Sequence, residues 1–435
     1  MNITRRDALK LALMGSGSLL FPMGFPQPAF AQLSPQIPRF QLPFRIPPIL
    51  QPLRSDGTTD YYQITLQQSQ VEILPGLITT IWGYNGITPG PTIRQRGGTQ
   101  NQGGRQSVVR FINQLGNDGN EEAINVTTHL HGMASLPQYD GHAEDLIPPG
   151  YFKDYIYPND RAATIWYHDH AIDQTARNVY MGLAGMYIVE DDDELNLPLP
   201  KGKYDIPLIL QDKRFDVDGT LVFEDRNQRS VYGDVMLVNG VPWPRMEVAN
   251  RKYRFRILNA SASRNYQLAL SRGMDSLSFG DQLIVIGSDG GLLSEPVEVT
   301  TPFQSLRIAM AERYDVIIDF SKYPLGTQLF LRNIGFSGSI DTDARSHTLM
   351  RFDIVREEAD NSTIPEILRP VKPIPIAEAV TTRTFRFERN QGRWKINFLR
   401  GFGGAISPTP PFCKGAGIIF DLRVRYMDSP KPIEG

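Results

Sequence analysis

Two pairs of histidines, each with one intervening residue, are the part of the sequence best suited to chemistry. They lie in THLH (His129 and His131) and in WYHDH (His168 and His170), and they account for four of the six histidines. Neutral imidazole is a good ligand for copper, zinc and iron. A single His-x-His is usually structural, but two of them among aromatic and β-branched residues indicate a metal site.

The spacing within each pair indicates how metal ions would be held. Alternate side chains of a strand point to the same face, so each pair shares a face while Asp169 points to the other one. Two strand positions are about 6.6 Å apart, which is long for two rings that grip one small ion but suits ions lying side by side. The absence of cysteine and carboxylate at these positions favours copper over zinc or magnesium.

The elements that must position these pairs are predicted to be strands. The chain has 435 residues with 38 Gly and 33 Pro, and short β-branched runs such as ATIWYHDH and GLAGMYIVE alternate with turn residues from about Tyr61 onward. None of these runs shows a sustained helical period. The fold class is therefore predicted to be all-β, with tandem sandwiches.

Breaks in composition predict the domain organisation. The acidic, Pro-ended stretch EDDDELNLPLP separates two sets of strands, and a charged, Pro-rich stretch follows the second set. The third set is about half the length of the roughly 100 residues that a β-sandwich needs. We predict an export signal at 1–31, a Pro-rich extended segment at 32–55, a first domain at 56–190, a second at 200–355, a linker at 356–380 and an incomplete third domain at 381–435.

The first residues predict export. Arg5 and Arg6 precede an apolar run, and Ala29-Phe30-Ala31 provides a small-x-small cleavage site, as in twin-arginine signals. A membrane anchor is the alternative, but the apolar run falls short of the ~20 residues needed to span a bilayer. We therefore expect a periplasmic or other extracytoplasmic location.

Charge and cysteine content limit the partners. The net charge is -2 with both signs mixed along the chain, so we expect neither nucleic acid nor a membrane as a partner, and a monomer if the protein is soluble. Cys413 is the single cysteine, which excludes a disulfide within the chain.

The two histidine motifs carry a resemblance to a known family. THLHG followed by WYHDHA resembles the first half of the copper signature of multicopper oxidases, in the spore-coat laccase and bilirubin oxidase branch, and YNGITPGPTIRQRGG and AERYDVIIDF are similar to neighbouring segments of that branch. The resemblance runs from about residue 55 to Asn397. It implies cupredoxin-like Greek-key sandwiches that bind four coppers. A type 1 copper takes electrons from a small reducing substrate, and a trinuclear type 2 and type 3 cluster reduces dioxygen to water.

The resemblance also implies roles for individual residues. His129 would be a type 2 copper ligand, and His131, His168 and His170 would be type 3 ligands. Asp140, eleven residues past His129, would be the carboxylate that orients water and delivers protons, although an Asp-Gly turn is the alternative. Trp166 and Tyr167 are expected to pack against the cluster, whereas His142 and His347 are not expected to be ligands.

The chain departs from the family after Asn397. The family's His-Pro-x-His-x-His and His-Cys-His runs do not occur, and Cys413 has no neighbouring histidine. A trinuclear cluster of the family type takes eight histidines, and this chain has six. We therefore predict a truncated or frame-shifted laccase-like oxidase that has type 2 and type 3 half-sites, lacks the type 1 site and is inactive alone.

Two other hypotheses remain. The chain could be a non-catalytic copper-binding or scaffold protein of the cupredoxin fold. A two-domain laccase that assembles its cluster between subunits is disfavoured, because it needs His-Cys-His within each chain.

Overall fold

A computed structural model describes most of the chain. The described residues are 33–98, 104–224, 230–274, 283–299, 305–335, 347–370 and 375, together with three strands at 381–390, 393–396 and 421–426. The predicted export signal at 1–31 and Cys413 lie outside these residues. The described residues from Ser34 onward belong to one compact unit.

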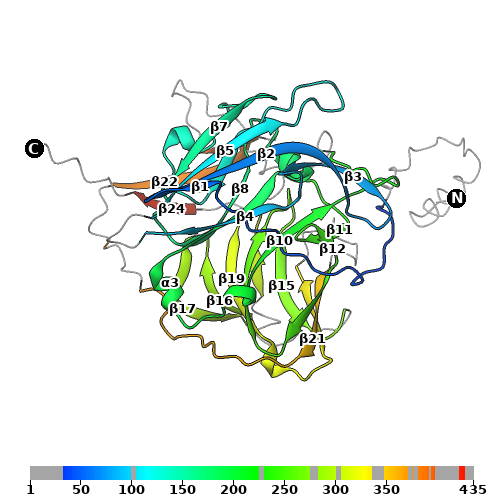
Figure 1. Ribbon diagram of the computed structural model, residues 1–435, viewed down its shortest axis with the longest axis vertical. Coiled ribbons are helices and arrows are strands. Elements are labelled where there is room, and N and C mark those ends of the chain that lie inside the picture. Colours follow the sequence, from blue (N-terminus) through cyan, green and yellow to red (C-terminus); the bar gives the residue numbers. More distant parts are fainter. Residues whose placement is uncertain are drawn as a thin grey trace, which may run out of the picture. The chain divides into compact units, whose positions relative to one another are not determined.

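The first part of this unit consists of two sheets. In one sheet the order is β1-β2-β5-β7, and β3 also pairs with β2; β2, β5 and β7 lie side by side in Figure 1. The other sheet has the order β4-β9-β8-β6. The strands are β1 (Arg54–Ser55), β2 (Thr59–Glu72), β3 (Ile78–Tyr84), β4 (Gly90–Arg96), β5 (Gln106–Gln114), β6 (Thr128–His131), β7 (Phe152–Tyr157), β8 (Ala163–Asp169) and β9 (Ala184–Glu190).

The second part also has two sheets, with the orders β12-β11-β10-β14-β19-β16-β17 and β13-β21-β20-β15-β18. The strands are β10 (Asp205–Lys213), β11 (Val235–Val238), β12 (Val241–Pro242), β13 (Arg245–Ala249), β14 (Lys252–Asn259), β15 (Tyr266–Ser271), β16 (Leu283–Ser288), β17 (Gly291–Val299), β18 (Leu306–Ile308), β19 (Arg313–Asp319), β20 (Gln328–Asn333) and β21 (Thr348–Arg356). A further sheet has the order β23-β22-β24, formed by β22 (Thr381–Asn390), β23 (Arg393–Ile396) and β24 (Asp421–Tyr426).

Helices are short in the described residues. Two α-helices, α2 (Thr175–Met181) and α3 (Asp192–Asn196), accompany three 3-10 turns, η1 (Pro137–Tyr139), η2 (Gly202–Tyr204) and η3 (Phe320–Lys322). The all-β prediction is confirmed, but it missed α2 and α3, because helices of two turns or fewer show no clear period. No described helix is both long and apolar enough to span a bilayer.

Apolar side chains form two large cores, of which the second also includes residues of the first part such as Ile81 of β3 and Tyr180 of α2. The first core contains Tyr84, Phe111 and Tyr167, and the second contains Phe255, Phe320 and Phe352. A smaller apolar cluster joins them: Trp166 of β8 and Met186 of β9 pack with Ile209, Leu258 and Ala260 of the second part. The strand that carries His168 is therefore held against both parts.

The Pro-rich segment at residues 33–53 runs along both parts. The N–H groups of Phe40 and Phe44 donate to the carbonyls of Trp243 and Arg245, at 2.9 and 2.7 Å, and Leu50 donates to Thr92 at 2.9 Å. Ser34 N donates to the Asp234 carboxylate at 2.8 Å. Phe40 is 4% exposed and belongs to the second core.

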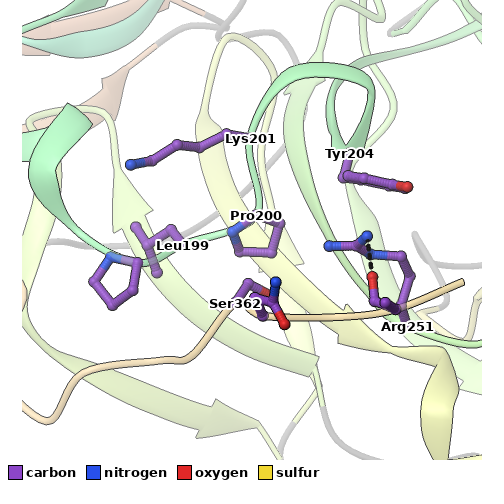
Figure 2. Close-up of a pocket in the computed structure, with 9 residues that line it drawn as sticks. Leu199, Pro200, Lys201, Tyr204, Arg251 and Ser362 are labelled. Carbon is purple, nitrogen blue, oxygen red and sulfur yellow. Dashed lines mark hydrogen bonds between the residues drawn. The ribbon is translucent and has the colours of Figure 1, made fainter.

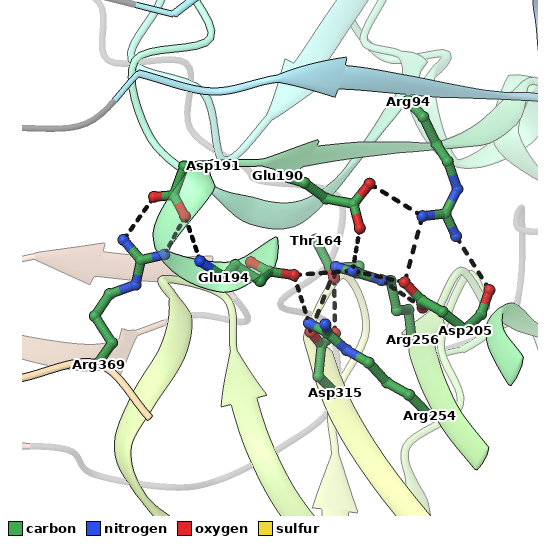
Figure 3. Close-up of polar contacts among 10 residues, drawn as sticks. All are labelled: Arg94, Thr164, Glu190, Asp191, Glu194, Asp205, Arg254, Arg256, Asp315 and Arg369. Carbon is green, nitrogen blue, oxygen red and sulfur yellow. Dashed lines mark hydrogen bonds and ion pairs between the residues drawn. The ribbon is translucent and has the colours of Figure 1, made fainter. Parts of the chain in front are cut away.

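A buried ion network lies between the two parts (Figure 3). Arg256 of β14 is fully buried; it contacts both carboxylate oxygens of Asp205, at 2.8 and 2.9 Å, and donates to Glu194 at 2.9 Å. The first part contributes Thr164 of β8, whose hydroxyl donates to Asp315 at 2.7 Å. The network consists of Arg94, Thr164, Glu190, Glu194, Asp205, Arg254, Arg256 and Asp315.

These charges stabilise one another. Burial alone would raise the pKa of the Asp205 carboxyl, but Arg256 and Arg254 hold it well below its ordinary value. A separate bidentate pair joins Arg369 to Asp191, with both contacts at 2.7 Å. The network ties β8 to β14 and β19 of the second part.

Candidate metal centre

The strands β6 and β8 bring the two histidine pairs together. They are antiparallel neighbours, with His129 opposite His168 and His131 opposite Trp166. Directly opposed residues of such a pair point to the same face. All four histidines therefore meet on one face of the sheet.

The ring distances show how closely the histidines approach. The centroid of the His129 ring is 5.5 Å from His131, 5.5 Å from His168 and 5.3 Å from His170. His168 is 5.6 Å from His131 and 5.9 Å from His170. We call these four residues the histidine cluster.

One pair of nitrogens has the spacing of two ligands of one ion. His131 Nδ1 lies 3.3 Å from His168 Nε2, and His129 has a ring nitrogen within 4.8 Å of both. Two imidazole nitrogens bound to one ion at about 2.0–2.1 Å lie roughly 3–3.5 Å apart. The closest nitrogens thus come from different His-x-His pairs rather than from the same one.

The outer nitrogens of two rings are held by main-chain carbonyls. His168 Nδ1 lies 2.7 Å from the Asp169 carbonyl oxygen, and His129 Nδ1 contacts the carbonyl of Asp140. A carbonyl accepts but cannot donate, so each Nδ1 carries the proton and each Nε2 keeps its lone pair. This arrangement is typical of histidines that bind metals.

Burial keeps the rings neutral. Burial lowers the pKa of His131 to about 3, assisted by Arg313 and His129, and it lowers the pKa of His168 well below the ordinary value. Burial also lowers the pKa of His170. Only the neutral ring offers a lone pair to a metal. Proton competition for these nitrogens is therefore weak near neutral pH.

These features fit copper. The donors are imidazole nitrogens, and the buried Nδ1 of His170 has no hydrogen-bond partner among the described residues. Imidazole suits copper, and a buried nitrogen without a partner is costly unless a ligand occupies it. The four residues predicted from the sequence therefore form a suitable copper-binding face.

Asp140 lies at the edge of the histidine cluster. It follows η1, and its Oδ1 is 3.4 Å from His129 Nδ1; the Asp140 side chain is 45% exposed. The next residue, Gly141, has a φ of +74°, so the Asp-Gly turn that we gave as the alternative is also present. The carboxylate contacts solvent and His129 at the same time.

The two aromatic neighbours differ. Trp166 packs against the cluster as predicted: its centroid is 4.1 Å from His168, and it stacks on His131 at 5.6 Å. The prediction for Tyr167 was wrong. Its side chain points to the opposite face of β8, where it packs 4.8 Å from Tyr84 and its hydroxyl donates to the Pro91 carbonyl at 2.6 Å. Strand alternation accounts for the difference.

Arg313 was not identified from the sequence. It begins β19 in the second part, its side chain is 3% exposed, and its Nε donates to the Thr164 carbonyl at 3.1 Å. Gly132, directly after His131, has a φ of +102°, and a Cβ there would lie 2.7 Å from Arg313 Nη2. The motif AERYDVIIDF gave no sign that this arginine reaches the histidine cluster.

The remaining histidines lie elsewhere. His142 is exposed, and its Nδ1 accepts from Glu144 N at 3.3 Å. Among the described residues, the group of close ring nitrogens consists of His129, His131 and His168, so it includes neither His142 nor His347. His170 belongs to the histidine cluster through its ring contacts with His129 and His168.

The structure also has a shallow pocket of about 320 Å³ (Figure 2). None of the residues that line it belongs to the histidine cluster. Leu199, Lys201 and Ser362 line it, and the Arg251 guanidinium carbon lies 3.6 Å from the Tyr204 ring centroid. It contains no histidine, and Arg251 is already bonded to Asp360 at 3.1 Å.

We expect acid to destabilise the metal-free protein. The unfolded chain takes up protons on His131, His168 and His170 near pH 6.5, whereas the folded chain does not, so the free energy of unfolding falls as the pH drops from 6.5 toward 3. Each histidine contributes up to about 1.4 kcal/mol per pH unit. Asp169 acts in the opposite sense up to about pH 7, because burial raises its pKa to about 7.

Urea unfolding between pH 5 and 7 measures this dependence. The control is the variant His131→Gln, whose slope should be shallower by about one proton. Equal slopes for the two proteins would contradict the burial of a neutral His131.

The chain is similar to known proteins in both sequence and structure. A family model described as multicopper oxidase matches residues 65–194. The bilirubin oxidase of Albifimbria verrucaria is 42% identical over 384 residues, which are 84% of this chain and 64% of that protein. A laccase of Bacillus stratosphericus is 34% identical over 388 residues, which are 80% of this chain and 72% of the laccase.

Solved structures agree with these relatives. The multicopper oxidase McoA of Aquifex aeolicus superposes with a TM-score of 0.69 and 31% sequence identity, covering 82% of this chain and 74% of McoA. The chain thus spans less than two thirds of the bilirubin oxidase and about three quarters of McoA.

Proposed function

The chain belongs to the multicopper oxidase family, and from this premise we propose that the histidine cluster is one half of a trinuclear copper centre. His129 would bind type 2 copper, and His131, His168 and His170 would bind type 3 copper. The observation that supports this most directly is the 3.3 Å separation of His131 Nδ1 and His168 Nε2, two neutral nitrogens from different strands. The resemblance to bilirubin oxidase and laccase and the all-β, cupredoxin-like fold are confirmed.

The residues of this chain prepare the site for metal. Burial keeps His131, His168 and His170 unprotonated. The carbonyls of Asp169 and Asp140 accept hydrogen bonds from Nδ1 of His168 and His129. Trp166 covers His168 and excludes water from that side. Copper bound there would supply one-electron redox chemistry toward dioxygen. The half-exposed Asp140 would exchange protons between solvent and the site, which is work for a carboxylate at the edge of a cluster.

We propose a laccase-like function: oxidation of phenols, bilirubin-like pigments or metal ions, with dioxygen as the acceptor. The chain by itself is proposed to be inactive, because it has six histidines and no His-Cys-His run. The alternative is a non-catalytic copper-binding or scaffold protein of the same fold. The same absence of type 1 ligands in the sequence favours it.

We further propose that the protein is exported through a twin-arginine signal and is monomeric. Neither nucleic acid nor a membrane is proposed as a partner, because the charge is balanced along the chain.

Copper titration of the full chain, followed by oxygen uptake, tests the proposal. We expect bound copper in an amount below four ions per chain, and no oxygen uptake with a phenol or bilirubin. The control replaces all four cluster histidines by alanine. Copper binding equal to that of the control would contradict the copper centre, and turnover with four bound coppers would contradict the inactivity of the chain.

A further inference from the structure

A buried carboxylate lies between His168 of β8 and His170, which directly follows that strand. Asp169 is 0% exposed and accepts three N–H groups: Thr127 N at 3.0 Å, Ala171 N at 3.1 Å and Asn178 Nδ2 at 2.8 Å. Its side chain points away from the histidine cluster, so it is not a ligand. Burying a carboxylate is costly unless its oxygens accept hydrogen bonds, so these three N–H groups stabilise the Asp169 side chain where it lies.

The donors come from the segments that carry the histidines. Thr127 precedes His129 by two residues, Ala171 directly follows His170, and Asn178 lies on α2. The regular ladder of β6 and β8 ends at the pair Thr128 and Asp169. His170 therefore lies one residue beyond the last strand pair.

Something other than the ladder must keep His170 beside His129. His170 N donates to the Thr127 carbonyl at 2.8 Å, and the Asp169 carboxylate accepts from Thr127 N. These two bonds extend the pairing of the two histidine segments by one residue. They account for the 5.3 Å separation of the His129 and His170 rings.

The helix α2 holds the carboxylate from the other side. Asn178 is 0% exposed, and its main-chain carbonyl accepts from Leu183 N at 3.0 Å, which joins Asn178 to the turn that follows α2. Thr175 Oγ1 donates to the Ala171 carbonyl at 3.1 Å, so the helix also holds the residue after His170.

We infer that Asp169 and Asn178 are positioning residues of the metal centre, which set the place of His170 and the register of the two histidine segments. The inference rests on the proposed copper function. An asparagine at position 169 would have the same shape but only one acceptor oxygen, so its amide N–H would face a main-chain N–H. Loss of an outer partner that bonds a ligand directly typically reduces metal affinity by about 10- to 100-fold, and Asp169 acts on His170 through the main chain, so we expect a loss toward the lower end of this range.

The test compares three variants of the full chain. We expect Asp169→Asn to lower copper affinity, toward the lower end of the range of about 10- to 100-fold, and to change the EPR spectrum of bound Cu(II). Asn178→Ala should act in the same direction with a smaller effect. The matched control is Asn113→Ala, because Asn113 is equally buried in the first part and its amide donates to Ile124 and Ile147, which do not touch the histidines.

The outcomes separate this inference from the proposed function. If the wild-type chain binds copper and Asp169→Asn changes affinity and spectrum no more than Asn113→Ala, the inference is overturned while the copper function stands. If the wild-type chain binds no copper, the proposed function fails. Hydrogen exchange of the metal-free protein then tests the inference. We expect the His170 amide to exchange faster in Asp169→Asn than in the wild-type chain, and at the wild-type rate in Asn113→Ala. Equal exchange rates in the two variants would overturn the inference.

Discussion

Replacement of His168 by glutamine is expected to reduce copper affinity by more than the roughly 100-fold that loss of an outer partner costs. His168 is 5% exposed and lies within 6 Å of all three other cluster rings, with centroid distances of 5.5, 5.6 and 5.9 Å. Its Nε2 forms the closest nitrogen pair, with His131. The variant removes the His168 nitrogen of that pair, and glutamine keeps a polar side chain of moderate size at the position.

Competition with a copper chelator measures this effect. The control variant is His142→Gln, because His142 is exposed and outside the histidine cluster. Its copper affinity should equal that of the wild-type chain, and urea unfolding shows whether His168→Gln is still folded. An affinity unchanged by His168→Gln would exclude His168 as a ligand.

Replacement of Arg256 by methionine is expected to lower the free energy of unfolding by about 3–5 kcal/mol. The guanidinium is fully buried and contacts four carboxylates, those of Asp205, Glu190, Glu194 and Asp315. Methionine fills much of the volume but leaves these carboxylates with less positive charge, so the loss of stability comes from buried charge without a partner. Thr164 also loses its contact with Arg256 Nη1 at 3.1 Å.

An exposed arginine provides the comparison. Arg110 pairs with Asp154 at 2.7 Å, and the two side chains are 43% and 40% exposed. Arg110→Met should cost about 0–1 kcal/mol, because solvent screens such pairs. Urea unfolding of both variants measures the difference, and a cost for Arg256→Met within that small range would show that the network adds little stability.

The sequence predicted the histidine faces well because alternation is a local property of strands. His129 and His131, or His168 and His170, share a face in any strand. The pairing of β6 with β8, with His129 opposite His168, could not be predicted, because register depends on the residues between the strands and on the packing of the whole sheet. Alternation also predicts that Tyr167 points away from His168, contrary to the expectation that Tyr167 packs against the cluster.

The contacts between the two parts were harder to predict from the sequence. Arg254 and Arg256 alternate with Tyr253, Phe255 and Ile257 in KYRFRILN, a pattern that predicts one polar face of a strand. A polar face is usually solvated, and only the tertiary structure shows that carboxylates of other strands bury it. Arg313 was missed for the same reason, because its partner Thr164 lies 149 positions away, whereas Asn178 was missed because the short helix α2 was not predicted.

The segment at residues 33–53 has a consequence for the order of folding. It is synthesised near the beginning, yet Ser34 bonds to Asp234, exactly 200 positions later, and Phe40 bonds to Trp243. These long-range contacts cannot form until the ribosome has released the strands of the second part, and contacts of such high sequence separation slow folding. The segment is therefore among the last to dock although it is among the first to be made.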